Sequence, residues 1–196
     1  SPTEMLQQLD MLAVLHATFW RDPVLQKFEW LTPGGVIHSN GVLERFSDFW
    51  DYVAPMPRFI HVPDGLKDRE RLLKANLALM AADMANPICV AHGDPHIGNM
   101  FFDPNGRPGL LDWATVMLGS WAWDVSYAMV INQSVEQRRA FERVQLEHYL
   151  GRLAALGADA PSLDSAWNDY ARHSVYMFNF VLCPPELQPE LLCTQS

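Results

Sequence analysis

Apolar residues recur every three or four positions through most of the chain, which is the spacing of one face of an α-helix. In the first such segment, residues 3–20, the positions Leu9, Leu12 and His16 fall on one face, and Thr3 is the expected N-cap. Turn signals and prolines interrupt the pattern over residues 22–41 and 55–63. Further helices are predicted over residues 41–53, 64–84, 121–132, 134–156 and 162–182.

The longest helix of the first half is expected to begin at Asp64, whose carboxylate can accept a hydrogen bond from the first turn. It is expected to stop before Asn86-Pro87, because proline cannot continue a helix. The helical spacing predicts one apolar face, made of Leu66, Leu73, Leu77, Met80 and Met84.

The pattern changes between residues 88 and 113. A short apolar run, Ile88–Ala91, is followed by a polar loop and then by residues 99–102 and 109–113, with a strong turn at Asp103–Gly106 between the last two. These segments predict two or three short strands packed against helices. The expected fold class is therefore mainly α with a small β element (α+β), in a single unit over residues 1–196.

Composition narrows the class of protein. The 196 residues are 49% hydrophobic and 19% charged, too apolar for a disordered chain, and no apolar run approaches the roughly 18 residues that a membrane helix needs. A net charge of −9 argues against binding to nucleic acid, which requires a basic surface. Cys89, Cys183 and Cys193 form no CxxC pair, so reduced thiols in a cytoplasmic protein are expected, with a Cys183–Cys193 disulfide as the alternative.

The candidate chemistry lies between His92 and Asp124. Residues 92–99 read His-Gly-Asp-Pro-His-Ile-Gly-Asn, which places Asp94 and Asn99 in a loop that proline and glycine keep out of a helix. Asp112 ends an apolar strand, where a carboxylate has no structural purpose. Between residues 75 and 137 only Arg107 is basic, so oxygen donors gather without cations, which suits Mg²⁺. The six acidic residues of that stretch are Asp83, Asp94, Asp103, Asp112, Asp124 and Glu136.

Structural explanations exist for each residue alone. Asp94 and Asn99 could form Asx turns, and Asp112 could cap the end of a strand. His92 and His96 have the spacing of a zinc-binding helix, but Pro95 prevents that helix and no third ligand is evident. A metal-dependent hydrolase using Asp94 and His96 lacks ligands for the same reason.

The motif His-Gly-Asp-x-x-x-x-Asn followed by Leu-Leu-Asp-Trp at 110–113 resembles the catalytic core of the aminoglycoside phosphotransferase and choline kinase family. The spacing up to Asp124 is also similar to the ecdysteroid-kinase-like branch, and residues 12–20 resemble the first large helix of the C-terminal lobe. The resemblance implies a protein-kinase-like fold and an ATP- and Mg²⁺-dependent phosphotransferase that acts on a hydroxyl of a small molecule.

The resemblance also assigns roles. Asp94 would be the catalytic base that accepts the proton of the acceptor hydroxyl, and Asn99 and Asp112 would hold Mg²⁺ and, through it, the ATP phosphates. His92 is expected to pack beneath the loop. Asp124 is expected to cap the helix over 121–132 and to brace the catalytic loop. Residues 1–87 would then be a helical region, 88–128 the catalytic and metal-binding segment, and 129–196 the C-terminal helices.

The family's N-terminal β lobe has no counterpart in the sequence before residue 5, and no glycine-rich phosphate loop or strand lysine is present. The chain therefore resembles the C-terminal lobe alone, with the missing lobe as an expected partner, and weak Mg²⁺-ATP binding is expected of it. A catalytically silent binding or scaffold domain is the alternative. The charge would suit a cationic acceptor, and the aromatic residues an apolar one.

Overall fold

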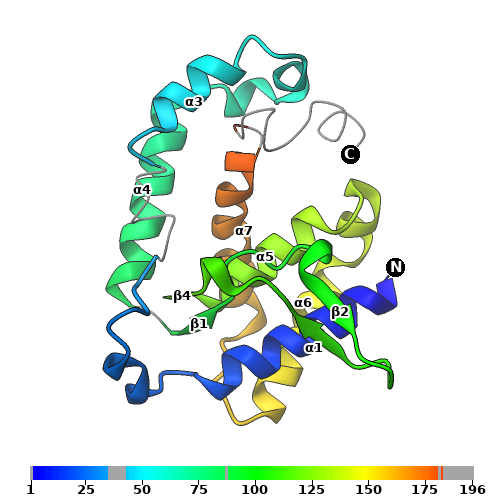
Figure 1. The fold of residues 1–196 in the computed structure, drawn as a ribbon. Coiled ribbons are helices and arrows are strands. Elements are labelled where there is room, and N and C mark those ends of the chain that lie inside the picture. Colours follow the sequence, from blue (N-terminus) through cyan, green and yellow to red (C-terminus); the bar gives the residue numbers. More distant parts are fainter. Residues whose placement is uncertain (1, 35–42, 87, 181, 183–196) are drawn as a thin grey trace.

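The computed structural model describes residues 2–34, 43–86, 88–180 and 182. Figure 1 shows long helices arranged around a small β element, which confirms the fold class expected from the sequence. The helices are α1 (Pro2–Thr18), α3 (Phe46–Val53), α4 (Arg69–Ala85), α5 (Trp121–Ile131), α6 (Val135–Ala155) and α7 (Leu163–Met177). The strands are β1 (Cys89–Ala91), β2 (Met100–Phe102), β3 (Pro108–Leu110) and β4 (Met117–Gly119).

Helix α5 lies at the centre of the molecule, packed against α1 and α7 (Figure 1). Every residue from Trp121 to Met129 is buried. A helix that carries apolar residues on every side is stable in water only when other elements surround it, so the central position of α5 follows from its sequence.

Two large apolar clusters meet at α5. One contains Trp123 and Tyr127 together with residues of α3, α4 and the end of α7. The other contains Trp121, Val125 and Met129 together with residues of α1, α6 and the start of α7. Opposite faces of α5 are therefore packed into the two clusters. Because both faces are close-packed, α5 is held rigidly, and any segment bonded to it is held in place as well.

The strands form two antiparallel pairs rather than one sheet. In the first, β1 pairs with β4, with Val90 opposite Leu118. In the second, β2 and β3 form a hairpin that places Phe101 opposite Gly109. Strand β4 was not among the strands predicted from the sequence, because Met117–Gly119 has three residues and no period-two pattern of its own.

Two predicted helix starts are wrong. Thr3 is not the N-cap of α1, since the helix already includes Pro2, whose fixed φ suits a first helical position. Asp64 is not the N-cap of α4. It begins a short 3-10 turn over Asp64–Leu66, and the cap is Asp68, whose carboxylate accepts a hydrogen bond from the Arg71 amide at 3.0 Å.

The predicted apolar face of α4 is also wrong in part. Leu66 and Leu77 are exposed, and the buried positions of the helix are Leu72, Asn76 and Met80. The buried face carries a polar residue, Asn76, whose side chain donates to the Leu72 carbonyl and accepts from Asn179. The prediction was right for Met80 and missed Asn76, because an apolar pattern counts only hydrophobic residues.

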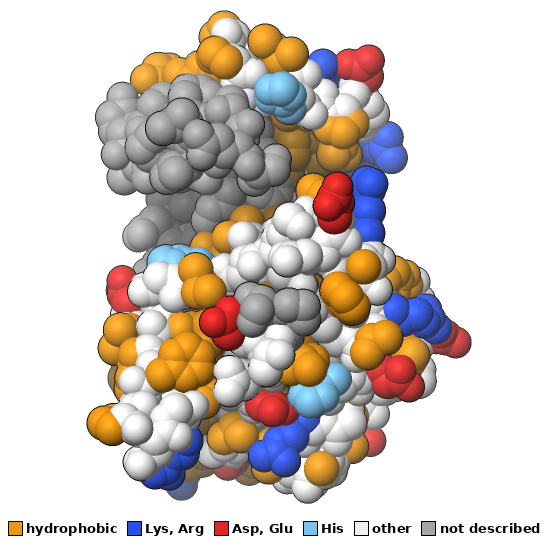
Figure 2. All heavy atoms as spheres, turned by 90° about the vertical axis from the view of Figure 1, so that its right-hand side faces the viewer, with side chains coloured by type: hydrophobic (Ala, Val, Ile, Leu, Met, Phe, Trp, Pro, Cys, Tyr) orange, Lys and Arg blue, Asp and Glu red, His pale blue; other side chains and the backbone are white. Residues whose placement is uncertain are grey.

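Several expectations fall on residues that the structure does not describe. They include residues 41 and 42 of the helix predicted over 41–53, residue 181 of the helix predicted over 162–182, and the Cys183–Cys193 pair. Within the described residues both predicted helices are too long, since α3 begins at Phe46 and α7 ends at Met177, where a 3-10 turn over Phe178–Phe180 follows. No helix within the described ranges is long and apolar enough to cross a membrane. On the face shown in Figure 2, acidic and basic side chains are interspersed with apolar ones.

Candidate active site

The loop of residues 92–99 connects β1 to β2, and its second residue is a glycine that the fold requires. Gly93 has φ +87°, and a Cβ at this position would collide with the backbone carbonyl of Thr115. The neighbouring Thr115 hydroxyl donates to the His92 carbonyl at 3.0 Å. Only glycine combines this conformation with this close approach, so the loop is packed directly onto the segment that follows Asp112.

Asp124 holds the start of the loop from beneath. Its side chain is fully buried and accepts hydrogen bonds from the amides of His92, at 2.7 Å, and Gly93, at 2.9 Å. The Nε2 atom of His16 lies 3.1 Å from the same carboxylate, and Nδ1 lies 2.8 Å from the Tyr149 hydroxyl. Because a carboxylate can only accept, we assign the proton to Nε2, and Tyr149 then donates to Nδ1. These donors offset the cost of burying the charge.

The expectation that Asp124 also caps α5 is wrong. The N-cap is Ser120, whose hydroxyl accepts a hydrogen bond from the Ala122 amide at 3.2 Å. Asp124 lies one turn further into the helix, where its carboxylate reaches the loop instead of the helix terminus.

His92 connects the loop to the end of β3. Its ring is buried, and Nε2 lies 2.8 Å from the carbonyl oxygen of Leu111, which can only accept. Nε2 therefore carries the proton, and Nδ1 accepts from the Asp94 amide at 3.3 Å. Both ring nitrogens thus have partners in the protein backbone.

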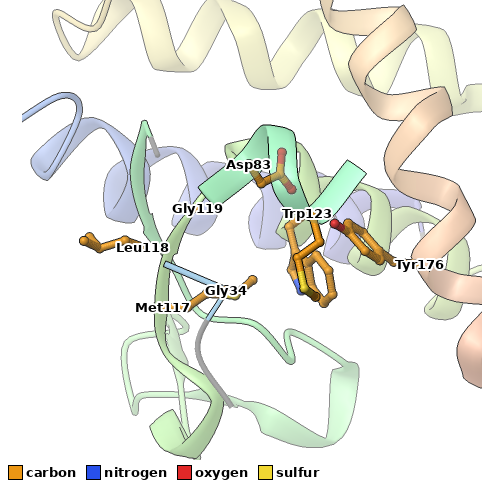
Figure 3. Close-up of a pocket in the computed structure, with 8 residues that line it drawn as sticks. Gly34, Asp83, Met117, Leu118, Gly119, Trp123 and Tyr176 are labelled. Atoms are coloured by element: carbon orange, nitrogen blue, oxygen red, sulfur yellow. The ribbon is translucent and has the colours of Figure 1, made fainter. Parts of the chain in front are cut away.

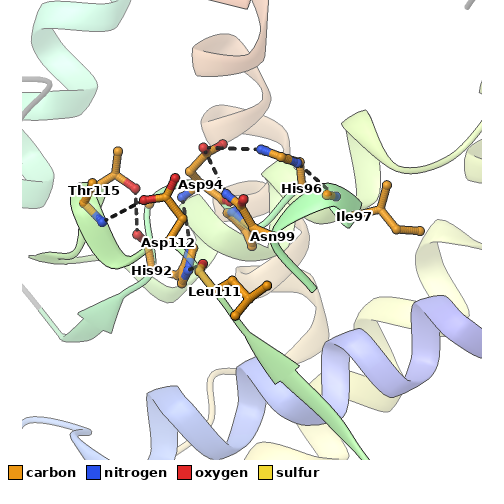
Figure 4. A network of polar contacts seen from close by, with 12 residues as sticks. His92, Asp94, His96, Ile97, Asn99, Leu111, Asp112 and Thr115 are labelled. Atoms are coloured by element: carbon orange, nitrogen blue, oxygen red, sulfur yellow. Dashed lines mark hydrogen bonds and ion pairs between the residues drawn. The ribbon is translucent and has the colours of Figure 1, made fainter. Parts of the chain in front are cut away.

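Asp94 lies at the open side of the loop, with its side chain 30% exposed (Figure 4). One carboxylate oxygen, Oδ1, accepts a hydrogen bond from the Tyr127 hydroxyl at 2.5 Å. The other, Oδ2, accepts from the Asn99 amide at 3.2 Å and lies 3.5 Å from Nε2 of His96. The carboxylate is therefore oriented from both sides while part of it stays accessible.

The Asn99 side chain is directed by the same contact. Its Nδ2 group donates to the Asp94 backbone carbonyl at 3.0 Å and to Oδ2 at 3.2 Å, which uses both of its hydrogens. The amide oxygen is left without a hydrogen-bond partner in the part of the chain that the structure describes. An oriented neutral oxygen of this kind suits a hard cation.

The outer edge of the loop is fixed by two amide side chains. Gln8, from α1, donates to the Pro95 carbonyl at 2.6 Å, and Asn132 donates to the same carbonyl at 3.2 Å. Asn132 also accepts from the Ile97 amide at 3.0 Å. Neither residue could be identified from the sequence, because Gln8 lies within α1, Asn132 lies at the end of α5, and the loop residues that they contact are distant in the chain.

Asp112 follows directly after β3 and has an unusual backbone. Its φ is +55°, in the left-handed region, which an aspartate adopts at an energetic cost. It is exposed, and Oδ1 accepts a local hydrogen bond from the Ala114 amide at 3.3 Å. The preceding Leu111 donates its amide to the Asn99 carbonyl at 2.8 Å, so Asp112 is attached to the same loop. Figure 4 shows Asp94, Asn99 and Asp112 gathered where the loop meets the end of β3.

These side chains fit a Mg²⁺ ion that is bound together with phosphate. Asn99 and Asp112 each offer an oxygen, and Mg²⁺ commonly takes one or two protein ligands and completes its shell with water and phosphate oxygens. Within residues 2–34, 43–86, 88–180 and 182, no group of three or more His, Cys, Asp or Glu side chains is arranged to hold a metal ion. The donor set thus suits a nucleotide-associated ion better than a zinc site.

Two other features near the loop are unsuited to catalysis. A cavity of about 10 Å³ lies between Met80, Asp83, Trp123 and Tyr176 (Figure 3), which is room for about one water molecule and too small for a substrate. Cys89 is buried in β1, and this burial, together with the negative charge of Asp124 and Asp83, raises the pKa of its thiol well above the ordinary value. A thiol in that environment is not a nucleophile.

The comparisons with known proteins agree with the resemblance seen in the sequence. The model of a family described as "Phosphotransferase enzyme family" matches residues 8–163, which is well over half of the chain. The match covers α1 from residue 8 onward, the 92–99 loop, Asp112 and Asp124. The search of curated proteins finds no match.

Proposed function

The chain belongs to the phosphotransferase enzyme family, and on that basis we propose that it transfers the γ-phosphate of ATP to a hydroxyl group of a small molecule. The observation that carries this proposal is the oriented carboxylate of Asp94. Neutral donors, Tyr127 and Asn99, hold both of its oxygens. Among the described residues, no Lys or Arg side chain contacts it, and the Nε2 atom of His96 lies 3.5 Å from Oδ2, which supports a role as proton acceptor.

In this mechanism Asp94 acts on the acceptor. The Oδ1 atom, which accepts from Tyr127, has a second lone pair, so the acceptor hydroxyl can donate a hydrogen bond to it and be aligned with the phosphate. As the oxygen of that hydroxyl forms its bond to phosphorus, its proton moves to Asp94. Phosphoryl transfer depends mainly on such positioning and on charge neutralisation.

The remaining residues of the site would serve the donor. Mg²⁺ bound with ATP would neutralise the charge of the phosphates, and Asn99 and Asp112 are the residues that would hold it. Asn99 keeps its amide oxygen turned toward the site because its nitrogen is bonded to Asp94. The exposed Asp112 carboxylate has one local hydrogen bond, which leaves its other oxygen available.

The acceptor is proposed by class only. The net charge of −9 favours a cationic or neutral acceptor over an anionic one, because an anion would approach a negative molecule. Aminoglycosides, choline-like alcohols and apolar alcohols all remain in this class. We place the reaction in the cytoplasm, on the expectation of reduced cysteines.

The test is a phosphoryl-transfer assay with radiolabelled ATP, Mg²⁺ and a panel of cationic, neutral and anionic hydroxyl compounds, using the full-length protein. Asp94→Asn should lower kcat by about 10²- to 10⁴-fold and leave nucleotide affinity nearly unchanged. Asp112→Ala should instead weaken the binding of Mg²⁺-ATP, measured by calorimetry. Asp103→Asn is the matched control, since Asp103 lies in the turn of the β2–β3 hairpin.

The outcomes separate the two candidate functions. Transfer that disappears in Asp94→Asn and persists in Asp103→Asn supports the phosphotransferase. If Asp94→Asn keeps full turnover, the assignment of the base is wrong. A protein that binds Mg²⁺-ATP and phosphorylates no compound of the panel would favour the catalytically silent binding domain.

A further inference from the structure

One face of α5 is bonded to three consecutive residues of the catalytic loop. The Trp123 indole donates to the Gly93 carbonyl at 2.9 Å, and Asp124 accepts from the amides of His92 and Gly93. One turn further along, the Tyr127 hydroxyl donates to Asp94 Oδ1 at 2.5 Å. Positions 123, 124 and 127 fall on the same side of a helix, so one rigid element determines the path of the loop.

The three contacts differ in what they hold. Those of Trp123 and Asp124 end on backbone atoms, so they fix the course of the chain but leave side chains free to turn. Tyr127 alone bonds a side chain, the carboxylate of Asp94. The Asp94 carboxylate also accepts a hydrogen bond from Asn99, but this bond is longer, at 3.2 Å, and it ends on the other oxygen, Oδ2. Rotation of the carboxylate about the Cβ–Cγ bond is therefore limited chiefly by the tyrosine.

Tyr127 is well suited to this task. It is 3% exposed, and its ring is part of the apolar cluster that α5 shares with α3, α4 and the end of α7. An aromatic side chain in a close-packed core has few accessible rotamers, so its hydroxyl is a fixed donor. A hydrogen bond from a fixed donor to a charged acceptor is about twice as strong as one between neutral groups.

We propose that Tyr127 is a positioning residue for Asp94, which holds the carboxylate in the orientation that accepts the proton of the acceptor hydroxyl. This inference rests on the proposed function. The sequence did not identify Tyr127, although it lies three positions after Asp124 on the same face of a predicted helix. In turnover, loss of the hydroxyl should affect the proton-accepting step and not the binding of nucleotide.

The main test compares Tyr127→Phe with Tyr170→Phe. Both tyrosines are buried and donate to a carboxylate, but Tyr170 donates to Glu142, at 2.9 Å, between α7 and α6. In the transfer assay, Tyr127→Phe should lower kcat by about 10- to 100-fold and change the KM for Mg²⁺-ATP by less than about twofold, because positioning acts on the chemical step. Tyr170→Phe should change neither value by more than about twofold.

A second measurement needs neither nucleotide nor acceptor. In protein carrying ¹³C at the carboxyl carbon of aspartate, the Asp94 resonance is identified by its loss in Asp94→Asn. It should move in Tyr127→Phe and stay in place in Tyr170→Phe. The converse experiment uses ¹³C at the phenol carbon of tyrosine, where Asp94→Asn should move the Tyr127 resonance and Asp103→Asn should not, so the contact can be tested even if Tyr127→Phe folds poorly.

The outcomes distinguish this inference from the proposed function. If the Asp94 resonance does not move, or kcat is unchanged while Asp94→Asn abolishes transfer, Tyr127 is not a positioning residue and the phosphotransferase proposal stands. A rise in KM with constant kcat would also overturn the positioning role. If Asp94→Asn leaves transfer intact, Asp94 is not the base and the positioning role of Tyr127 fails with it, whatever the resonances show. If the unmodified protein phosphorylates no compound of the panel, the proposed function fails instead.

Discussion

The two aspartates on either side of the 92–99 loop have opposite surroundings. Asp124, beneath the loop, is fully buried and accepts hydrogen bonds from two backbone amides and from His16. Asp112, at the open side, is exposed and accepts a local bond from the Ala114 amide. The two aspartates therefore differ in role. The Asp124 carboxylate is fully engaged in hydrogen bonds that stabilise the fold, and the Asp112 carboxylate is available for a ligand.

This difference extends to the residues around each aspartate. On the buried side, several side chains hold the loop or its supports in place through hydrogen bonds, namely those of His16, His92, Trp123 and Tyr127. The open side is held by short-range contacts and by a backbone in the left-handed region. Strained conformations persist only where the surrounding structure imposes them, and they are frequent at functional sites. In the proposed reaction, a rigid Asp94 and a more adaptable Asp112 would suit a nucleotide that must enter and leave.

The largest expected effect is the loss of the buried carboxylate. Asp124→Ala should lower the free energy of unfolding by about 3–5 kcal/mol, because two backbone amides and the His16 N–H group lose their acceptor inside the protein. Asp112→Ala, the matched change at the open side, should cost no more than about 1 kcal/mol. Urea denaturation followed by circular dichroism measures both. Equal losses would mean that burial does not separate the two aspartates.

A smaller effect is expected at Tyr149, the far end of the same buried network. Tyr149→Phe should destabilise the protein by about 1–2 kcal/mol at neutral pH, because the Nδ1 atom of His16 loses its donor. Burial, reinforced by the nearby Cys89 and Asp124, raises the pKa of the Tyr149 phenol well above its usual value. The raised pKa of Tyr149 should also make the free energy of unfolding depend on pH.

The direction of this pH dependence depends on whether the folded or the unfolded state can ionise the Tyr149 phenol. Below about pH 10 the phenol is neutral in both states, and its contribution to stability is complete. Above that pH the unfolded chain ionises while the folded one cannot, so stability should fall by about 1.4 kcal/mol per pH unit for this group. Tyr149→Phe removes that contribution, and the decline of unfolding free energy between pH 10 and 11 should become shallower by about this amount. An unchanged slope would contradict the burial of the hydroxyl.

The parts of the site that the sequence predicted are those determined locally. The apolar run before His92, the glycine and proline of the loop and the apolar residues of α5 each specify their own conformation, and the structure confirms these elements. The β2–β3 hairpin was expected for the same reason, from its turn at Asp103–Gly106. Residue types at short spacing were sufficient there.

The parts that the sequence did not predict depend on competing local choices or on distant partners. Asp64 and Asp68 are equally good caps in isolation, and Gly65 explains the outcome, since glycine within the first turn of a helix costs stability. Tyr127 and Asn132 act on residues more than 30 positions away, at Asp94 and Pro95. No pattern within a window of the sequence contains such a contact.

The smallest effect concerns the backbone of Asp112 itself. Asp112→Gly and Asp112→Ala both remove the carboxylate, but only glycine adopts φ +55° without strain, so the glycine variant should be more stable by about 1 kcal/mol. Both should lose Mg²⁺-ATP affinity equally, which separates the conformation of the residue from its chemistry. The matched pair is Glu147→Gly and Glu147→Ala at an exposed position within α6, where the order should reverse by a similar amount because glycine disfavours a helix. Urea denaturation of the four variants gives both differences. If alanine is the more stable residue at both positions, the left-handed backbone at Asp112 is not imposed by the fold, and backbone strain no longer distinguishes the open side of the loop from the buried side.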